Sequence, residues 1–386
     1  MIRKVLYLGV LGHLLVAFWN GFFGPSFGAD LDAIAFHDAA VKFSRTLIWG
    51  DFQIGWIYSN FLGYLYSFLI PSVFLGSLVS VFFWYFSAKI LLATADLLSF
   101  ESRDKFYLLV IYAFLPSSIL ITSVTLREVF QLFFVNITIF SLLKIYQKKT
   151  ILYLMPLTLA LVGSGVLHGA LIVSNAFILS AAGLFLYANG RSIQLIFKKI
   201  VGLVFVLAVL MAGLSIFSIG FYGLDDGLNI AVQTYQEGAV SAEGRATYKT
   251  ADGLTTMVDL FLFLPYGVIQ YLFEPYPWHV STLSDLLLMI ENLLRGWLIL
   301  TAYKTFQNIS EQRRPLFVFL ALSYLAMEIT WSVGTVNWGT AVRHHIPSMG
   351  ILLLLAFFNF SNLPNGFIGN QFKFFRRTIR ASLTGR

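Results

Sequence analysis

Long apolar runs recur along the whole of this chain, and short polar turns separate them. About 20 mostly apolar residues form an α-helix long enough to cross the hydrocarbon layer of a bilayer. We therefore predict an all-α, polytopic integral membrane protein with about ten transmembrane helices, which forms a single domain over residues 1–386. The predicted spans are 4–23, 72–96, 106–125, 129–146, 151–167, 169–187, 200–222, 284–303, 316–336 and 346–360.

Two further apolar stretches, 53–70 and 257–273, are bounded by prolines and loop residues, so their hydrophobicity alone does not decide whether they span. The distribution of positive charge favours interfacial or re-entrant helices, because 19 of the 26 lysines and arginines then fall on one side. Cytoplasmic loops carry an excess of these residues. We therefore expect both termini and the basic tail, 361–386, in the cytoplasm. The loops 24–71 and 223–283, each with an interfacial helix, are expected on the outer face.

Composition agrees with this picture. The chain is 58% hydrophobic and 12% charged, whereas a soluble domain carries about 25% charged residues. Cysteine is absent, which excludes disulfides, thiolate metal sites and a cysteine nucleophile. The basic residues behind the pI of about 9.4 lie in short loops, which indicates a topology signal and not nucleic-acid binding. The first run follows Arg3 and Lys4 without a cleavage-site pattern, so we expect it to remain as a span.

Ionisable side chains gather on the predicted outer face. The first outer loop contains GADLDAIAFHDAA directly after the first span, a place where charge is costly. Later outer segments contain LREVF, GVLHGA and NWGTAVRHHIP. Because segments distant in sequence bring such groups to one side, we expect a shared site. The candidate residues are Asp30, Asp32, His37, Asp38, Arg127, Glu128, His168, Trp338, Arg343, His344 and His345.

Some of the acids also have a purely structural interpretation. Either Asp30 or Asp32 could cap the helix that is predicted to begin near Leu31, because a short acidic side chain accepts hydrogen bonds from the first turn. A capping role of this kind fits Asp38 and Asp51 better than a chemical role.

The other candidates have structural alternatives too. Arg127 and Glu128 could neutralise each other, and His168 could be a hydrogen-bonded packing residue. Arg343 could extend to lipid headgroups, as long basic side chains do at membrane surfaces. An interfacial position fits the histidines of the last outer loop better than ligand binding; these are His344 and His345.

The set of residue types suits one kind of chemistry. Carboxylates act as general bases or as metal ligands, and arginine binds phosphate through a planar fork of donors. Aromatic side chains form 17% of the chain and can pack against sugar faces and lipid tails. A carboxylate beside arginines at the membrane surface fits glycosyl transfer from a lipid phosphate carrier, because arginine offsets the charge that the leaving phosphate gains.

The acidic loop after the first span resembles the acidic motif of GT-C membrane glycosyltransferases, which use polyprenyl-phosphate sugars. The stretches WIYSNFLGYLYSFLIPS, ESRDK and LPSSILITSVTLRE follow in the order that this family shows. The late stretch AVRHHIPSMGILLLL is similar to the Arg-plus-Pro start of a late span in such enzymes. The resemblance covers most of the chain as architecture. It departs from the family in that only a short basic tail follows the last predicted span.

The resemblance implies roles for the candidates. The catalytic base is Asp30 or Asp32, of which Asp30 lies nearer the span. Arg127 and Arg343 bind the phosphate of the carrier. A divalent cation on the two aspartates is compatible with the site but not required. The implied partners are the bilayer, a polyprenyl-phosphate-linked sugar and a glycan or lipid acceptor, in a bacterial inner membrane. Residues that bind or orient substrate are then His37, Glu128, His168, Trp338 and His344.

Two other functions stay open. The set of Arg127, His168 and Arg343 also resembles that of O-antigen polymerases and EpsG-type proteins, which extend or ligate lipid-linked oligosaccharides. This second resemblance implies that the donor is a whole repeat unit and not a single sugar. The loop 223–283, with Tyr235, Tyr248 and the cluster PYPWH, is expected to close over the site.

A transporter or lipid-sugar flippase is the third hypothesis, because ionisable residues within spans mark transport pathways. Glu291 and Arg295 lie four residues apart in a predicted span, which predicts an intrahelical ion pair. Glu328, deep in another predicted span, has no evident partner in the sequence.

Overall fold

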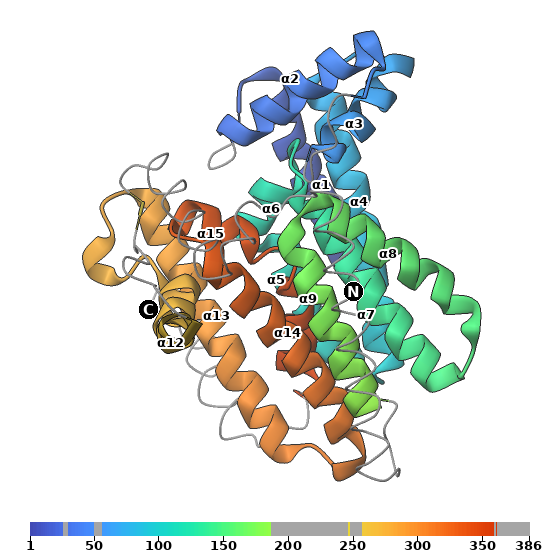
Figure 1. The fold of residues 1–386 in the computed structure, drawn as a ribbon, viewed down its shortest axis with the longest axis vertical. Helices are drawn as coiled ribbons and strands as arrows, with labels where there is room; N and C mark the ends of the chain where they lie inside the picture. The colour runs from blue at the N-terminus through green and yellow to red at the C-terminus, as the bar shows by residue number, and fades with distance from the viewer. Residues whose placement is uncertain (26–29, 50–55, 187–245, 248–256, 359, 361–386) are drawn as a thin grey trace, which may run out of the picture.

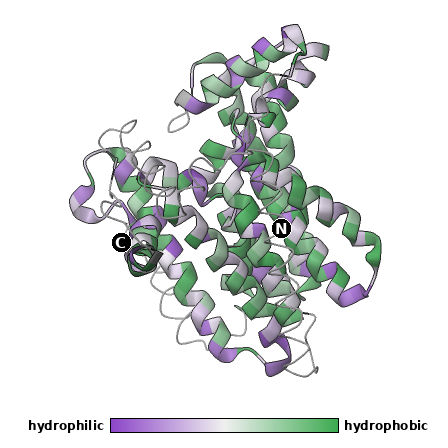
Figure 2. Cartoon of the chain, viewed as in Figure 1, coloured by the Kyte–Doolittle hydropathy of each residue, from purple (hydrophilic) through white to green (hydrophobic). Residues whose placement is uncertain are grey.

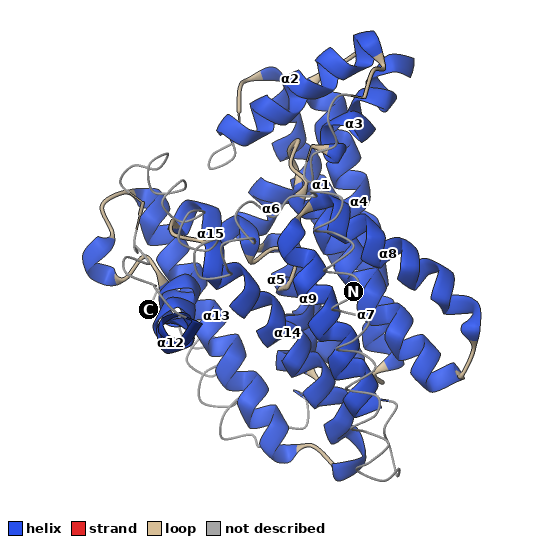
Figure 3. Cartoon of the chain, viewed as in Figure 1, coloured by secondary structure: helices blue, strands red, loops and turns tan. Residues whose placement is uncertain are grey.

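The computed structural model describes residues 1–25, 30–49, 56–186, 246–247, 257–358 and 360. Within these ranges the regular secondary structure is helical throughout, with no strand (Figure 3). The prediction of an all-α protein is therefore confirmed for the described part of the chain.

Six of the described helices are long and apolar enough to cross a membrane. They coincide with predicted spans 4–23, 72–96, 129–146, 169–187, 284–303 and 316–336. These helices are α1 (Ile2–Phe22), α4 (Val73–Leu97), α7 (Glu128–Lys148), α9 (Gly169–Ala181) with its π-helical continuation η2 (Ala182–Leu186), α13 (Leu283–Asn308), and α14 (Arg314–Gly334) preceded by η5 (Glu311–Arg313).

Two more predicted spans, 106–125 and 346–360, contain sharp breaks. Helix α5 (Ser102–Phe114) meets α6 (Pro116–Thr122) at 59°, and α15 (Trp338–His344) meets α16 (Met349–Phe357) at 66°. Each break contains a proline, which removes a backbone donor and disfavours helical geometry in the residue before it. If each bent pair counts as one span, the described residues hold up to eight candidates, compared with the ten predicted for the whole chain.

The remaining predicted elements are shorter or lie outside the description. Predicted span 151–167 forms η1 (Ile151–Tyr153) and α8 (Leu154–Leu167), and stretch 257–273 forms α12 (Met257–Phe273), followed by η4 (Pro277–His279). Predicted span 200–222, the tail 361–386 and most of the loop 223–283, including Tyr235 and Tyr248, lie outside the described residues.

The predicted loop 24–71 contains two helices where one was expected. They are α2 (Asp30–Thr46) and α3 (Ile57–Phe68), which pack on each other and stand at one end of the bundle (Figure 1). Their close approach needs a glycine, because a Cβ on Gly63 would lie 2.7 Å from the carbonyl oxygen of Ala40. Tyr66 then ties α3 to the start of α4, since its hydroxyl donates to the carbonyl of Ser72 at 3.0 Å.

Hydrophobic residues line the bundle helices, and hydrophilic residues gather at the turns between them (Figure 2). At one end Lys105 pairs with Asp96 at 2.7 Å, and Arg313 donates to the carbonyl of Leu98. Lys148 closes α7 at the same end, which we call the basic end. Because consecutive spanning helices run in alternate directions, α2, α3 and the start of α7 lie at the other end. We call this the site end.

Polar side chains inside the bundle bond from helix to helix. Tyr112 of α5 donates to the hydroxyl of Ser87 on α4 at 2.9 Å, and Asn136 of α7 donates to the same oxygen at 2.8 Å. His13 of α1 contacts the hydroxyl of Thr122 on α6 at 3.0 Å. Helices in a bilayer gain little from the hydrophobic effect between one another, so such bonds help to hold the bundle together.

Candidate functional site

Arg343 holds two carboxylates that come from distant parts of the chain. Its Nη2 and Nε donate to Oε1 of Glu128 at 2.9 and 3.2 Å, and its Nη1 donates to the carboxylate of Asp32. The side chain of Glu128 is 1% exposed, that of Arg343 12% and that of Asp32 52%. We call these three residues the ion cluster. It has a buried, fixed side at Glu128 and an open side at Asp32.

Helix ends bring the three residues together. Glu128 is the first residue of α7, Asp32 lies in the first turn of α2, and Arg343 lies in the last turn of α15. Acidic groups are favourable at helix N-termini and basic groups at C-termini, because each opposes the partial charge of the helix there. Arg343 is largely buried and paired, so the alternative that it extends to lipid headgroups is wrong.

Arg127 precedes Glu128 but points elsewhere. Its Nη1 donates to the carbonyl of Leu167 at 3.2 Å, at the end of α8, where helix carbonyls lack internal partners. Its guanidinium carbon lies 5.5 Å from the ring centre of Phe36 on α2. The alternative that Arg127 and Glu128 neutralise each other is therefore wrong, and Arg127 instead joins the α8–α9 corner to α2.

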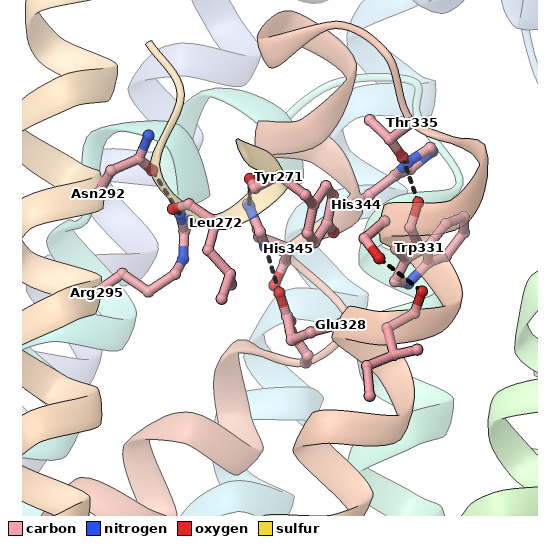
Figure 4. Close-up of polar contacts among 12 residues, drawn as sticks. Tyr271, Leu272, Asn292, Arg295, Glu328, Trp331, Thr335, His344 and His345 are labelled. Carbon is pink, nitrogen blue, oxygen red and sulfur yellow. Dashed lines mark hydrogen bonds and ion pairs between the residues drawn. The ribbon is translucent and has the colours of Figure 1, made fainter. Parts of the chain in front are cut away.

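Two histidines meet on the ring of Trp331, near the end of α14. His344 stacks on it with ring centres 4.0 Å apart, His168 lies edge-on at 4.5 Å, and the two histidines are 5.8 Å apart. The hydroxyl of Thr335 donates to the carbonyl of Trp331, so Nδ1 of His344 donates to that hydroxyl at 2.8 Å (Figure 4). Nδ1 of His168 accepts from the amide of Ala170 at 3.2 Å and caps α9. In the neutral rings, Nε2 is an acceptor on His344 and a donor on His168.

His345 faces the bundle interior. Its Nδ1 lies 2.7 Å from Oε2 of Glu328, and its Nε2 donates to the carbonyl of Tyr271 at 3.1 Å (Figure 4). Ser348 donates to the other oxygen of Glu328. Glu328, which has no evident partner in the sequence, thus has two. His345 and His344 are each 6% exposed, so their rings are surrounded by other parts of the protein, and the interfacial position expected for both stays a prediction.

Two predicted substrate residues make structural contacts. His37, on α2, has its Nδ1 3.0 Å from the hydroxyl of Tyr66, which ties α2 to α3. Trp338 is 5% exposed, and its indole nitrogen donates to Oδ1 of Asp285 at the start of α13 at 3.1 Å. Neither has a contact with the ion cluster among the interactions of the described residues, and their substrate roles remain predictions.

The structure describes the remaining acids of the predicted loop 24–71 only in part. Asp30 is the first residue of α2, but its side chain lies outside the described residues, as does Asp51. Asp38 is exposed in the middle of α2, so the expectation that it caps a helix is wrong. The choice between Asp30 and Asp32 as the base therefore remains open, although Asp32 is the one that reaches Arg343.

Several residues of the site were missed from the sequence. Phe36, Trp331 and Thr335 read as ordinary apolar or helical positions, and no local pattern marks them as partners of the arginines and histidines. Only the spacing of Trp331 and Thr335, four apart at the C-terminal end of α14, offers a signal, because residues at this spacing share a helix face.

A divalent cation at this site remains a prediction. Among the described residues, no group of three or more histidine, aspartate or glutamate side chains is arranged to hold a metal ion. Asp32, one of the two aspartates expected to bind it, faces the guanidinium of Arg343. A positive charge already occupies the position that a cation would take, so this arrangement does not fit a metal on Asp32.

Comparisons of the chain with protein-family models, with curated proteins and with solved structures find no match. The site is therefore interpreted from its geometry. Two arginines and two histidines converge with two carboxylates at the site end of the bundle. Such a set can bind an anion through charge-assisted hydrogen bonds and can take up a proton on a carboxylate.

Proposed function

We propose that this protein is a membrane glycosyltransferase that moves a sugar from a polyprenyl-phosphate-linked donor to an acceptor at the site end of the bundle. The observation that carries the proposal is the asymmetry of the ion cluster. Glu128 is enclosed and fixes one edge of Arg343, whereas Asp32 is half exposed and holds the other edge. A phosphate can replace Asp32 on that edge without disturbing the first contact, because arginine presents its donors as a fork.

The exchange places the reacting groups side by side. When phosphate takes Nη1 of Arg343, the carboxylate of Asp32 is released next to it. Asp32 then accepts the proton of the acceptor hydroxyl as that oxygen attacks the anomeric carbon. The bond from the anomeric carbon to the phosphate oxygen breaks, and the phosphate leaves with the electron pair. Arg343 offsets the charge that the phosphate gains.

Arg127 and the histidines complete the binding surface. Arg127 lies at the α8–α9 corner beside His168, whose neutral ring offers an Nε2 donor. The neighbouring His344 offers an Nε2 acceptor. The ring centres of His168 and His344 are 5.8 Å apart. The donor on one ring could orient a phosphate while the acceptor on the other orients a sugar hydroxyl.

The distribution of charge supports an outer location for the site end. The basic end carries Lys105, Lys148 and Arg313, and lysine and arginine mark cytoplasmic loops. The site end then faces the periplasm or the cell exterior, and the reaction belongs to the assembly of surface polysaccharide in a bacterial inner membrane. Transfer of a whole repeat unit is a second candidate, because the exposed side of Asp32 sets no limit on the size of the transferred group.

The proposal is tested in a deletion strain that expresses Asp32→Asn, Asp30→Asn or Arg343→Lys at the wild-type membrane level. Mass spectrometry measures the surface glycans and the lipid-linked intermediates. We expect Asp32→Asn to accumulate the same intermediate as the deletion. Arg343→Lys should lose about 10- to 100-fold in glycan output, because hydrogen bonds to a charged group contribute about 1.5–3 kcal/mol and lysine lacks the fork.

Matched controls come from the same helix. Asp38→Asn and Arg45→Lys change exposed residues of α2 and should retain normal glycans. The accumulated intermediate identifies the donor, since a defect in a single sugar transfer leaves a truncated unit and a defect in polymerisation leaves a complete one. Normal glycans in both Asp30→Asn and Asp32→Asn would refute the proposal.

A further inference from the structure

A second group of polar residues lies inside the bundle, between the two bent helix pairs. A cavity of about 30 Å³ is lined by the α5–α6 break, by α13, by α14 and by the α15–α16 break. On the same measure a water molecule needs roughly 10–15 Å³. The polar residues of the lining are Ser117, Glu291, Arg295, Tyr324, His345 and Ser348, and the remainder is apolar.

Glu291 is enclosed with only part of its hydrogen-bonding capacity used. The residue is 6% exposed. Its Oε1 accepts from the backbone amide of Ser117 at 2.8 Å, in the first turn of α6, where amides have no partner within the helix. Its Oε2 has no hydrogen-bond partner among the described residues. One oxygen of the carboxyl group therefore accepts a hydrogen bond, and the other is available for a further hydrogen bond or for a proton.

The counterion expected for Glu291 is held elsewhere. Nη1 of Arg295 donates to the carbonyl of Leu272 at 3.1 Å and to Oδ1 of Asn292 (Figure 4). Leu272 lies in the last turn of α12, where helix carbonyls lack internal partners. The predicted ion pair of Glu291 with Arg295 is therefore wrong, and each side chain instead satisfies the end of another helix.

The other ionisable groups at the cavity are already engaged, with one exception. His345 and Glu328 hold each other at 2.7 Å, and Ser348 donates to Glu328. From α14, the hydroxyl of Tyr324 has no partner among the described residues. The wall formed by α5 is apolar. The unused polar atoms at the cavity are thus Oε2 of Glu291 and the hydroxyl of Tyr324.

An ionised carboxylate with a single hydrogen bond is costly in such surroundings, whereas a neutral carboxylic acid gains a donor that the cavity can use. We propose that this cavity is a proton-binding site inside the membrane domain, with Glu291 as the proton acceptor and with cavity water and Tyr324 as its hydrogen-bond partners. The proton comes from solvent and adds to Oε2, and no other bond changes. The site is separate from the ion cluster, and its assignment does not rest on the proposed function.

The elements that enclose the proton site also lead to the ion cluster. The backbone amide of Ser117, which donates to Glu291, lies in the first turn of the short helix α6. The chain that leaves the other end of α6 leads to Glu128 at the start of α7. His345 follows Arg343 by two residues and caps the C-terminal end of α15, at the start of the second break. Glu291 therefore lies at the same cavity as both segments that lead to the arginine and to its buried carboxylate.

Infrared difference spectroscopy of the purified full chain in lipid nanodiscs tests the site. The wild type should show the C=O stretch of one protonated carboxylic acid at neutral pH, with the frequency shift that exchange into deuterium oxide causes. Glu291→Gln should remove this band, and it keeps the oxygen that accepts from Ser117. The matched control Glu311→Gln, at an exposed position of the basic end, should retain the band.

A second substitution guards against loss of the fold. Glu291→Asp should show a carboxylic acid band at a shifted frequency, because the acid remains in a changed hydrogen-bonding environment. The proposal is overturned if the wild type lacks the band. It is also overturned if the band persists in Glu291→Gln, or if Glu328→Gln alone removes it, since the proton would then belong to the Glu328–His345 pair.

Discussion

A guanidinium group enclosed in a membrane domain needs acceptors for its donors and a balancing charge. Arg343 obtains both from Glu128 and Asp32, but the two carboxylates differ in consequence because one is enclosed and the other is half exposed. Removal of one partner of a buried ion pair strongly destabilises the folded protein, because the other charge then stays buried without compensation. An exposed pair contributes little, because water screens it.

This contrast predicts the effect of Glu128→Ala. Removal of the buried partner should lower the free energy of unfolding by about 3–5 kcal/mol, because the charge of Arg343 stays buried. The matched control is Glu311→Ala, which breaks the exposed pair of Glu311 with Arg314 and should cost no more than about 1 kcal/mol. Thermal unfolding in detergent, followed by tryptophan fluorescence, measures both. Equal shifts in the two variants would contradict the burial argument.

The sequence indicated which residues form the ion cluster, but it did not indicate which of them contact one another. Acids and arginines next to spans stand out because charge is rare there. Mutual neutralisation of Arg127 and Glu128 was one of the two interpretations left open, and the two side chains do not pair. Neighbouring positions on a helix point about 100° apart, so consecutive residues face different parts of the bundle. Which helix lies in each direction depends on the packing of the whole chain.

At the scale of elements, helix ends inside the bundle attract polar side chains from other helices. Arg127 meets the end of α8, Arg295 meets the end of α12, and Glu291 meets the start of α6. The hydrophobic pattern places the spans but does not reveal where a span breaks. Pro116 and Pro347 were the available signals, and a continuous helix was predicted across the first of them. Of the three contacts, the one between Glu291 and the start of α6 lies at such a break.

The contact between α2 and α3 should weaken in acid. Tyr66 donates its hydroxyl hydrogen to Ser72, so the neutral His37 ring donates from Nδ1 to Tyr66. Burial lowers the pKa of His37 below its ordinary value of 6.5, and the charge of Asp38 offsets part of this effect. The folded state therefore binds fewer protons than the unfolded state as the pH falls below 6.5, and its stability decreases.

Hydrogen–deuterium exchange on either side of pH 6.5 measures this effect. Once the intrinsic pH dependence of exchange is removed, peptides of α2 and α3 should exchange faster in acid, and peptides of α4 and α7 should not. His37→Gln keeps a donor that does not titrate, so it should abolish the difference. A difference that survives in His37→Gln would assign the effect to another group.

At the scale of the whole molecule, six of the predicted spans match helices of spanning length, because long apolar runs are the strongest signal in a membrane sequence. Among the described residues the remaining predicted spans match less well, since two runs meet a bend and one forms a shorter helix. The orientation in the membrane comes only from the charge distribution and remains a prediction.

The absence of cysteine makes that orientation directly measurable, because each introduced cysteine is the only reactive thiol. Asp38→Cys places one at the site end and Lys148→Cys places one at the basic end, both at exposed positions. A maleimide that cannot cross membranes should label Asp38→Cys in intact cells, and should label Lys148→Cys only after the membrane is opened. The opposite pattern would place the site in the cytoplasm and refute the proposed outer-face reaction.

The ion cluster also has a consequence for biosynthesis. Arg343 lies 215 residues after Glu128 and 311 residues after Asp32. A ribosome therefore delivers both acids long before the arginine that balances them. Until the last helices are translated, α7 presents an uncompensated carboxylate within an unfinished bundle. A chain that stops before α15 thus lacks the arginine that balances both acids, and the ion cluster is complete only once α15 has been made.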